Sequence, residues 1–452
     1  MVIYWLIFVL VVAFIINYFA TRGDFWAPQN VFTLGFLVAA IFCTYLIDFF
    51  SVNLSWLTFF VIISGVIAFS VGSWLVFLGY EFLGYERRHI DDYGPLCKKY
   101  CPSKVVTLVC IVFCAATTLL FIRNVISVSG TFTTITDVTY AYRSEGYDGT
   151  QLQPFYVNQM VKVFKAIAYV FLFYFVNNVV YTKNLRGNIR LLVPAALLVV
   201  MSVFGASRAE LITIFFYIFT VIFFTYGRTH AFANRASRKL IKYLVVSVSV
   251  FLLAFSGMRT LVGRLNTDDP MTYISSYAGG SIELLDLYVR DDGLEPQSSI
   301  FGEETFFAME SDLGITTGSP HLEFRYSANG RLVGNVYTCF KKYLHDFGYL
   351  GMLMIEWTLG LIFTGWYLGT KTHIANNPSD HRLVYFAYFY VPVVKSFVQE
   401  ETLSAYFCLN SLVMFLLFWF VYWVTTEAFD ATQSLYAGVH YPVKCSQRFN
   451  RE

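Results

Sequence analysis

The segment GMRTLVGR (Gly257–Arg264) opens the one long polar passage of this chain, and the segment GNVYTCFKKYLHDFGYLG (Gly334–Gly351) closes it. The first segment follows an apolar run and the second leads directly into another. Paired acids, several glycines and further arginines lie between them. These features predict that residues 259–346 form a large loop held at one face of a membrane, and that any chemistry takes place there.

The rest of the chain has the composition of a membrane protein. Hydrophobic residues make up 57% of the 452 residues and charged residues only 14%, whereas soluble domains carry roughly 25% charged residues. A span needs about 20 apolar residues, and in lipid the backbone satisfies its polar groups within its own helix. We therefore expect an all-α polytopic membrane protein with about eleven transmembrane helices. The expected spans are 2–20, 31–49, 56–79, 105–126, 158–181, 190–205, 209–226, 243–258, 347–370, 383–398 and 403–425.

The positions of lysine and arginine predict the orientation. These residues concentrate in the loops 80–104 and 227–242 and in the tail 426–452. Because cytoplasmic loops carry the excess of lysine and arginine, the pattern predicts an external N-terminus and a cytoplasmic C-terminus. The chain then divides into helices within 1–258 with an external loop near 127–158, the large external loop 259–346, helices within 347–425, and a cytoplasmic tail 426–452.

Two stretches of the large loop have helical periodicity. Apolar residues from Ile274 to Tyr288 recur at spacings that predict a helix over 270–289. Residues 334–347 place apolar side chains on one side and Lys341 and Lys342 on the other, which predicts an amphipathic helix lying along the membrane surface.

Arginines are the candidate ligands for an anion. Arg208 lies in FGASRAEL (Phe204–Leu211), a short turn between two apolar runs, and an arginine at membrane depth is costly unless it faces a cavity or a partner. A contact with Glu210 or with a lipid head group is the alternative. Guanidinium binds phosphate bidentately and keeps its charge, so external arginines predict binding of a diphosphate attached to a lipid. The further candidates, each otherwise a surface charge, are Arg143, Arg259, Arg264, Arg325 and Arg331.

Candidate bases and sugar ligands lie in the same external segments. A sugar hydroxyl that attacks needs a carboxylate or an imidazole within hydrogen-bond reach. The candidates for this catalytic role are His345, Asp346, Glu323 and Glu401, with an interfacial cap or ion pair as the alternative for each. Asn335 and Tyr337 offer hydrogen bonds suited to sugar hydroxyls. The pair Cys97 and Cys101 lacks the four ligands of a zinc site, and no metal or other cofactor is expected.

The motifs that carry these residues resemble those of a known family. FGASRAEL is similar to the G-S-R-G/A-x-L signature of bacterial oligosaccharide repeat-unit polymerases, the Wzy or O-antigen polymerase family. GNVYTCFKKYLHDFGYLG resembles that family's N-V-Y-T…D-F-G segment, which also leads into a helix. The number of spans, the chain length and the position of the large loop agree, so the resemblance covers most of the chain. Ala206 and Ala209 beside Ser207 and Arg208 depart mildly from the signature.

The resemblance implies a GT-C-like glycosyltransferase in a bacterial inner membrane, with its site on the external face. Such an enzyme transfers a growing glycan from undecaprenyl diphosphate to the sugar of an incoming undecaprenyl-diphosphate-linked repeat unit. Arg208 would then bind the donor diphosphate, and Asn335, Tyr337 and Asp346 would belong to the external site. The expected partners are lipid-linked oligosaccharides and membrane lipids; a chain-length regulator and a flippase remain open as protein partners, and no nucleic acid is expected.

Three other functions remain open from the sequence. An O-antigen ligase that transfers glycan to lipid A core would share the donor and the external loop. A lipid-linked oligosaccharide flippase would be expected to have short loops, which the large loop argues against. A passive scaffold for polysaccharide assembly would be insensitive to the loss of any single arginine.

Overall fold

The structure, a computed structural model, describes residues 1–83, 100–130, 134–147, 152–230, 232, 234–257, 269–316, 323–376 and 381–437. Helices make up 77% of it, and within the described ranges the strands form a single two-stranded hairpin. The expectation of an all-α fold is confirmed at this level. Arg259 and Arg264 lie outside the described residues.

Eight helical segments in the described part of the chain are long and apolar enough to cross a membrane. Their bounds are Val2–Ala20, Trp56–Phe82, Lys104–Ser129, Phe155–Thr182, Arg186–Phe204, Arg208–Thr229, Phe340–Thr372 and Leu409–Thr426. In the helix numbering they belong to α1, α4, α6, α8, η1 with α9, α10, α15 and α17. Three further expected spans, 31–49, 243–258 and 383–398, correspond to α2, α11 and α16 and are not among the eight. The chain is therefore a membrane protein of several spans.

The remaining elements are shorter or only partly apolar. The helices concerned are α2 (Pro28–Thr44), α3 (Ile47–Phe50), α7 (Ile135–Tyr147), α11 (Asn234–Gly257), α12 (Pro270–Ala278), α13 (Gly280–Asp291), α14 (Phe307–Asp312) and α16 (Arg382–Lys395). One of the eight segments combines two helices, η1 (Arg186–Leu192) and α9 (Val193–Phe204). Two helices are longer than the segments given above, namely α15 (Phe340–Asn376) and α17 (Leu409–Ala437). The hairpin pairs β1 (Arg325–Tyr326) with β2 (Leu332–Gly334) in antiparallel order.

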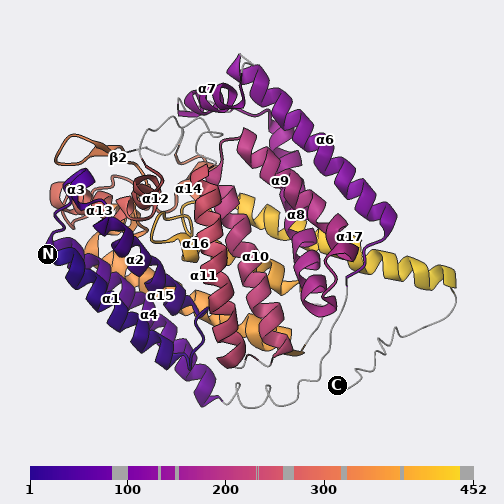
Figure 1. The fold of residues 1–452 in the computed structure, drawn as a ribbon, viewed down its shortest axis with the longest axis horizontal. Helices are drawn as coiled ribbons and strands as arrows, with labels where there is room; N and C mark the ends of the chain where they lie inside the picture. Colours follow the sequence, from indigo (N-terminus) through magenta and orange to yellow (C-terminus); the bar gives the residue numbers. More distant parts are fainter. Residues whose placement is uncertain are drawn as a thin grey trace.

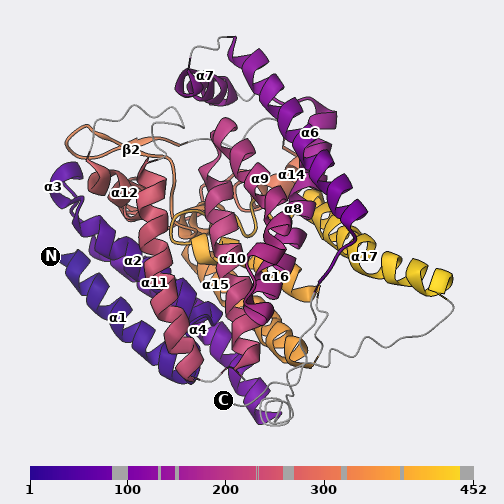
Figure 2. The ribbon, with the colours of Figure 1, turned by 45° about the vertical axis from the view of Figure 1, so that its right-hand side comes forward.

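The long helices form two groups with a central set between them. Figure 1 shows α1, α2, α4 and α15 on one side and α6, α8, α9 and α17 on the other, and Figure 2 gives the same grouping from a second direction. Between them, α10 packs against α8 and α16, and α16 also packs against α2. The loop segments with α3, α7, α12, α13, α14 and the hairpin gather at one end of these helices (Figure 1). We call this end the outer end.

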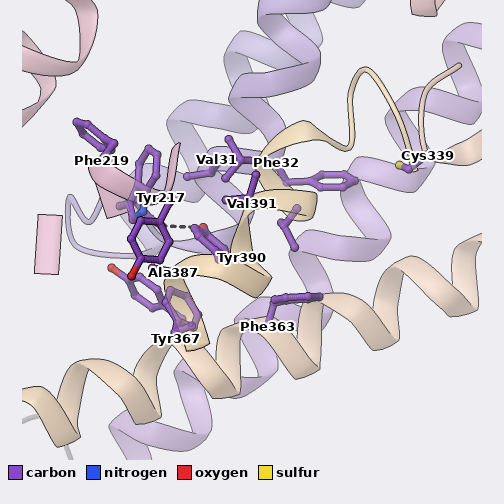
Figure 3. Close-up of a cluster of buried hydrophobic side chains, with 14 of the residues drawn as sticks. Val31, Phe32, Tyr217, Phe219, Cys339, Phe363, Tyr367, Ala387, Tyr390 and Val391 are labelled. Atoms are coloured by element: carbon purple, nitrogen blue, oxygen red, sulfur yellow. Dashed lines mark hydrogen bonds between the residues drawn. The ribbon is translucent and has the colours of Figure 1, made fainter. Parts of the chain in front are cut away.

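Aromatic side chains fill the place where α2, α10, α15 and α16 meet. Figure 3 shows Phe32, Tyr217, Tyr367 and Tyr390 from these four helices around one apolar cluster. Each of these rings is almost completely buried. Large rings bury much area for little loss of side-chain freedom, so this cluster fixes the helices that carry the polar residues described below.

Two glycines bring α4 and α15 into backbone contact. A Cβ added to Gly72 would meet the carbonyl oxygen of Trp357, and one added to Gly360 would meet that of Phe69. Small residues permit such close helix packing where lipid supplies no hydrophobic driving force.

The first turns of α15 fold back at Gly348. The Sγ atom of Cys339 lies 3.1 Å from Oε1 of Glu356, whereas 17 residues of straight helix would separate them by about 25 Å. The reversal occurs at Gly348, whose φ of 64° and ψ of −169° are not helical, and a positive φ of this kind favours glycine. The segment 340–347 therefore turns into the bundle, where Phe340 is fully buried and stacks on Phe36 with 4.8 Å between ring centroids.

Two sequence expectations for helices of the large loop need correction. The helix expected over 270–289 is two helices that break at Gly279, where a Cβ would collide with the backbone of Cys43 on α2. The amphipathic helix expected over 334–347 begins only at Phe340 and is buried, not lying on a surface. Its lysines are paired inside the protein.

Candidate functional site

Arg208 is the first residue of α10 and is 8% exposed. Its Nη1 atom donates to the hydroxyl oxygen of Tyr273, and its guanidinium lies over the rings of Tyr273 and Tyr277 at 5.4 and 4.9 Å from their centroids. Both tyrosines belong to α12, in the loop between α11 and α15. Arg208 therefore joins the outer end of the bundle to the large loop.

The position of Arg208 favours an anion. The free N–H groups at the start of a helix carry partial positive charge, so a cation in the first turn adds to it and is not stabilised by it. The nearest acid in sequence, Glu210, is bonded to α8: its Oε2 lies 2.6 Å from Nζ of Lys165 and its Oε1 accepts from Tyr169 at 2.7 Å. The alternative in which Arg208 pairs with Glu210 is therefore not what the structure shows, because both carboxylate oxygens of Glu210 are bonded to α8.

Arg325 is surrounded by carboxylates. It forms ion pairs with Glu323, Asp291 and Asp292, of which the Asp291 contact measures 2.6 Å, and donates to the carbonyl oxygen of Leu287 at 3.0 Å. Burial acts to raise the pKa of Glu323, but Lys341 and Arg325 outweigh it and hold that pKa below its usual range. We call these four charged residues, with Lys341 and Glu304, the outer network.

Lys341 and His345 connect the outer network to α15. Nζ of Lys341 lies 2.5 Å from Oε1 of Glu304 and 3.0 Å from Oε2 of Glu323, and this side chain is 5% exposed. Nε2 of His345 is 3.9 Å from Oε1 of Glu304, and its Nδ1 is 3.5 Å from the hydroxyl of Tyr288. His345 is thus beside a carboxylate and a phenol, with its side chain 22% exposed.

Asp346 holds a loop in place. Its Oδ2 accepts the backbone N–H of Thr305 at 2.6 Å and that of Glu304 at 3.1 Å. The side chain is buried, at 6% exposure. These bonds fix the loop before α14 against the first turns of α15, which is a positioning role for the carboxylate.

Glu400 and Glu401 have different partners although they are adjacent. Glu400 accepts from the hydroxyl of Tyr343 at 3.0 Å and from the backbone of Leu403 and Ser404 at 2.7 and 3.0 Å. Glu401 instead forms an ion pair with Lys395, the last residue of α16. The loop between α16 and α17 therefore contacts the head of α15 through one glutamate and the end of α16 through the other.

The remaining predicted residues are spread over the outer end. Tyr337 is 8% exposed and donates to the carbonyl oxygen of Glu323 at 3.2 Å, and burial raises the pKa of its phenol so that it keeps its proton. Asn335 is half-buried directly after β2. Arg143 lies on α7, which packs on α6 and α9. The contacts described above bring together Glu323, Arg325, Tyr337 and His345, whereas those of Arg208 are with α12.

Sequence reasoning missed several of these partners. Lys165 and Glu356 are charged residues inside apolar runs, and that position alone marks a side chain as functional or paired. Tyr273, Tyr277 and Glu304 could not be singled out in this way, because tyrosines and acids are common in a polar loop.

The outer end offers hydrogen-bond donors and acceptors but no evident metal cage. Within the described ranges, no three His, Cys, Asp or Glu side chains are arranged to hold a metal ion. What the site provides is a buried guanidinium on aromatic rings, an imidazole beside a carboxylate, and a neighbouring pair of lysine–glutamate contacts. No protein-family model, curated protein or solved structure matches this chain.

Proposed function

We propose that this protein polymerises undecaprenyl-diphosphate-linked oligosaccharide repeat units into an O-antigen or capsule-like polysaccharide. It would act as a membrane glycosyltransferase of GT-C-like fold in the bacterial inner membrane, with about eleven spans and its site on the periplasmic or external face. The observation that carries the proposal is the burial of Arg208 at the start of α10, against two tyrosines of the large loop.

The proposed reaction is a displacement at the anomeric carbon of the growing glycan. A hydroxyl oxygen of the incoming unit forms a bond to that carbon, and the bond from the carbon to the phosphate oxygen breaks. The lipid diphosphate leaves with the electron pair, and the hydroxyl proton passes to a base. The leaving group supplies the driving force, so the reaction needs no nucleotide.

Arg208 would stabilise the departing diphosphate. A guanidinium fixed on aromatic rings is pre-organised to receive a phosphate, and such a group is most effective where charge develops in a site that excludes water. Arg325 suits this role less well, because three carboxylates already surround it.

The base would come from His345, Glu323 or Glu401. His345 is the candidate whose contacts are longest, at 3.5 Å to Tyr288 and 3.9 Å to Glu304, and a base needs a nitrogen or oxygen that can still take up a proton. Asp346, which already accepts two backbone N–H groups, would position the loop beside His345.

The test is a strain lacking the gene, complemented with wild type or Arg208→Ala, with surface polysaccharide separated on a gel. The proposal expects a ladder from wild type and a single repeat unit from both the null strain and the variant. Full ladders retained on undecaprenyl diphosphate in the null strain would identify a ligase. Loss of even single units at the surface would identify a flippase, and a full ladder from Arg208→Ala would reject the diphosphate role.

A further inference from the structure

Two lysine–glutamate pairs lie together where α8, α10 and α16 pack against one another. Lys165 of α8 pairs with Glu210 of α10, and Lys395 of α16 pairs with Glu401 in the following loop. Glu210 also interacts electrostatically with Lys395, and Lys165 with Glu401. The four side chains are therefore one group without net charge, which we call the paired-charge cluster.

Tyrosines border the paired-charge cluster. Tyr169 donates to Glu210 at 2.7 Å, and its ring centroid lies 5.0 Å from that of Tyr388. The ring of Tyr388 is in turn 5.5 Å from that of Tyr406. Tyr388 and Tyr406 are partly exposed, whereas Tyr169 is fully buried. Two aromatic rings thus remain accessible next to the charged groups.

Stability does not explain four charged residues at this place. A buried ion pair rarely stabilises a protein more than apolar side chains of the same volume would, and ionisable groups inside a membrane domain generally serve function. The cluster is also not sealed, because the side chains of Lys165, Glu210 and Glu401 are 29%, 12% and 12% exposed.

The paired-charge cluster and Arg208 lie on different faces of α10. Arg208 and Glu210 are two residues apart, a spacing at which helical side chains do not face each other. Arg208 contacts the tyrosines of α12, and Glu210 contacts α8. The first turn of α10 therefore carries the proposed diphosphate ligand on one face and a member of the cluster on another.

We propose that the paired-charge cluster is a sugar-binding subsite. Carboxylates accept from sugar hydroxyls and ammonium groups donate to them, while the partly exposed rings of Tyr388 and Tyr406 can cover the C–H face of a pyranose. Because each ammonium group is already paired with a carboxylate and the cluster has no net charge, a neutral, polyhydroxylated ligand fits it better than a diphosphate does. The sugar concerned is that of the incoming lipid-linked unit, an identification that rests on the proposed function.

The experiment measures the binding of two lipids to the full chain in nanodiscs by microscale thermophoresis. One is the undecaprenyl-diphosphate-linked repeat unit purified from the host, and the other is undecaprenyl diphosphate, which carries no sugar. The test variant is Lys165→Met with Glu210→Leu, since an apolar pair preserves the packing. The matched control is Lys371→Met with Asp24→Asn, which removes a 2.7 Å ion pair between α15 and the loop preceding α2.

The inference predicts at least tenfold weaker binding of the repeat-unit lipid to the test variant, with binding of undecaprenyl diphosphate changed less than twofold. The control variant should bind both lipids as wild type does. Tyr406→Leu, which keeps an apolar side chain in place, should weaken binding of the repeat-unit lipid by about threefold. It provides a second test if the double test variant fails to fold.

The failures of the two proposals are distinguishable. If the test variant binds both lipids as tightly as wild type and still forms a ladder, the sugar subsite is wrong and the polymerase proposal stands. If a folded test variant lost affinity for both lipids equally, the cluster would be a phosphate site and the sugar assignment would be rejected. If wild type binds neither lipid, both proposals are rejected.

Discussion

Arg208 and Arg325 both lie at the outer end of the helices, but their electrostatic surroundings differ. Arg325 contacts three carboxylates, two of them on exposed aspartates, in a network in which carboxylates outnumber cations. Arg208 contacts a phenol and two aromatic faces and is 8% exposed. A phosphate arriving at Arg325 would have to displace acids, whereas the contacts of Arg208 described above are with a phenol and aromatic rings. Convergence of arginines at one face therefore does not by itself make them a single anion site.

The sharpest test of this contrast is to remove each guanidinium in turn. Arg208→Ala should lower polymerisation by about 100-fold, because two charge-assisted hydrogen bonds to the leaving group would be lost. Arg325→Ala is the matched control and should lower it less than about threefold. Rates of chain extension by purified protein on lipid-linked units measure both. Equal losses would show that the two arginines share one role.

The contact between α15 and the loop before α14 should depend on Asp346. Asp346→Ala leaves two buried backbone N–H groups without their charged acceptor, and we expect a loss of about 4 kcal/mol in the free energy of unfolding. Thermal unfolding in detergent measures this loss. Asp346→Asn, which retains one acceptor oxygen, should lose roughly half as much. A variant with unchanged melting but no activity would instead make Asp346 a catalytic residue.

Two glutamates of the large loop should make opposite contributions to the pH dependence of the free energy of unfolding. Burial, and secondarily Asp286, raises the pKa of Glu283 from 4.5 to about 7, although Arg290 opposes it. The folded protein therefore binds more protons than the unfolded chain between about pH 4.5 and 7, and Glu283 destabilises it increasingly as pH rises through that window. Glu283→Gln should raise the free energy of unfolding at pH 8 by about 3 kcal/mol and have little effect at pH 4.5.

Glu323 supplies the matched comparison. Its pKa is lowered in the folded protein, so its stabilisation is present above the ordinary value of 4.5 and is lost as pH falls through the folded value. Glu323→Gln should therefore destabilise the protein at pH 8 and have less effect near pH 4. Melting curves of both variants across this range test the signs, and parallel pH dependences would contradict the assignment of Glu323 to an ion-paired network.

A smaller loss of activity than that of Arg208→Ala is expected from changes to Tyr273, whose ring lies against Arg208. Tyr273→Phe keeps the aromatic face and removes only the hydroxyl that accepts from Nη1. One hydrogen bond of this kind contributes about 1 kcal/mol, so chain extension should fall by roughly fivefold. Tyr273→Leu, which also removes the ring, should lower the rate further. If the two variants were equal, the stacking on Tyr273 would have no part in the placement of Arg208.

The sequence was sufficient for the helical class and for the choice of Arg208 as a candidate, because both depend on local features. An apolar run needs no partner to be recognised as a span, and an arginine between two such runs is conspicuous by position. The partners of Arg208 could not be predicted in this way. Tyr273 lies 65 residues away in sequence, and nothing local distinguishes it from the other tyrosines of the loop.

Local sequence patterns also could not predict that neighbouring residues have different partners. Glu400 and Glu401 have the same chemistry and adjacent positions, yet one accepts from α15 and the other pairs with α16. Likewise the break between α12 and α13 depends on the approach of Gly279 to Cys43, a contact across more than 200 residues of sequence. Such arrangements follow from packing between segments that are distant in sequence, and the periodicity of one segment carries no information about that packing.

The fold-back at Gly348 has a consequence for how the chain enters the membrane. The helical segment that starts at Phe340 contains the expected span 347–370, yet its first turns must end beside Phe36 of α2 and Gly65 of α4. These two residues precede Phe340 by 304 and 275 residues, so α2 and α4 are synthesised well before it. We therefore expect α15 to integrate in two stages, with the long arm inserted first and the short arm docked afterwards against helices already in position.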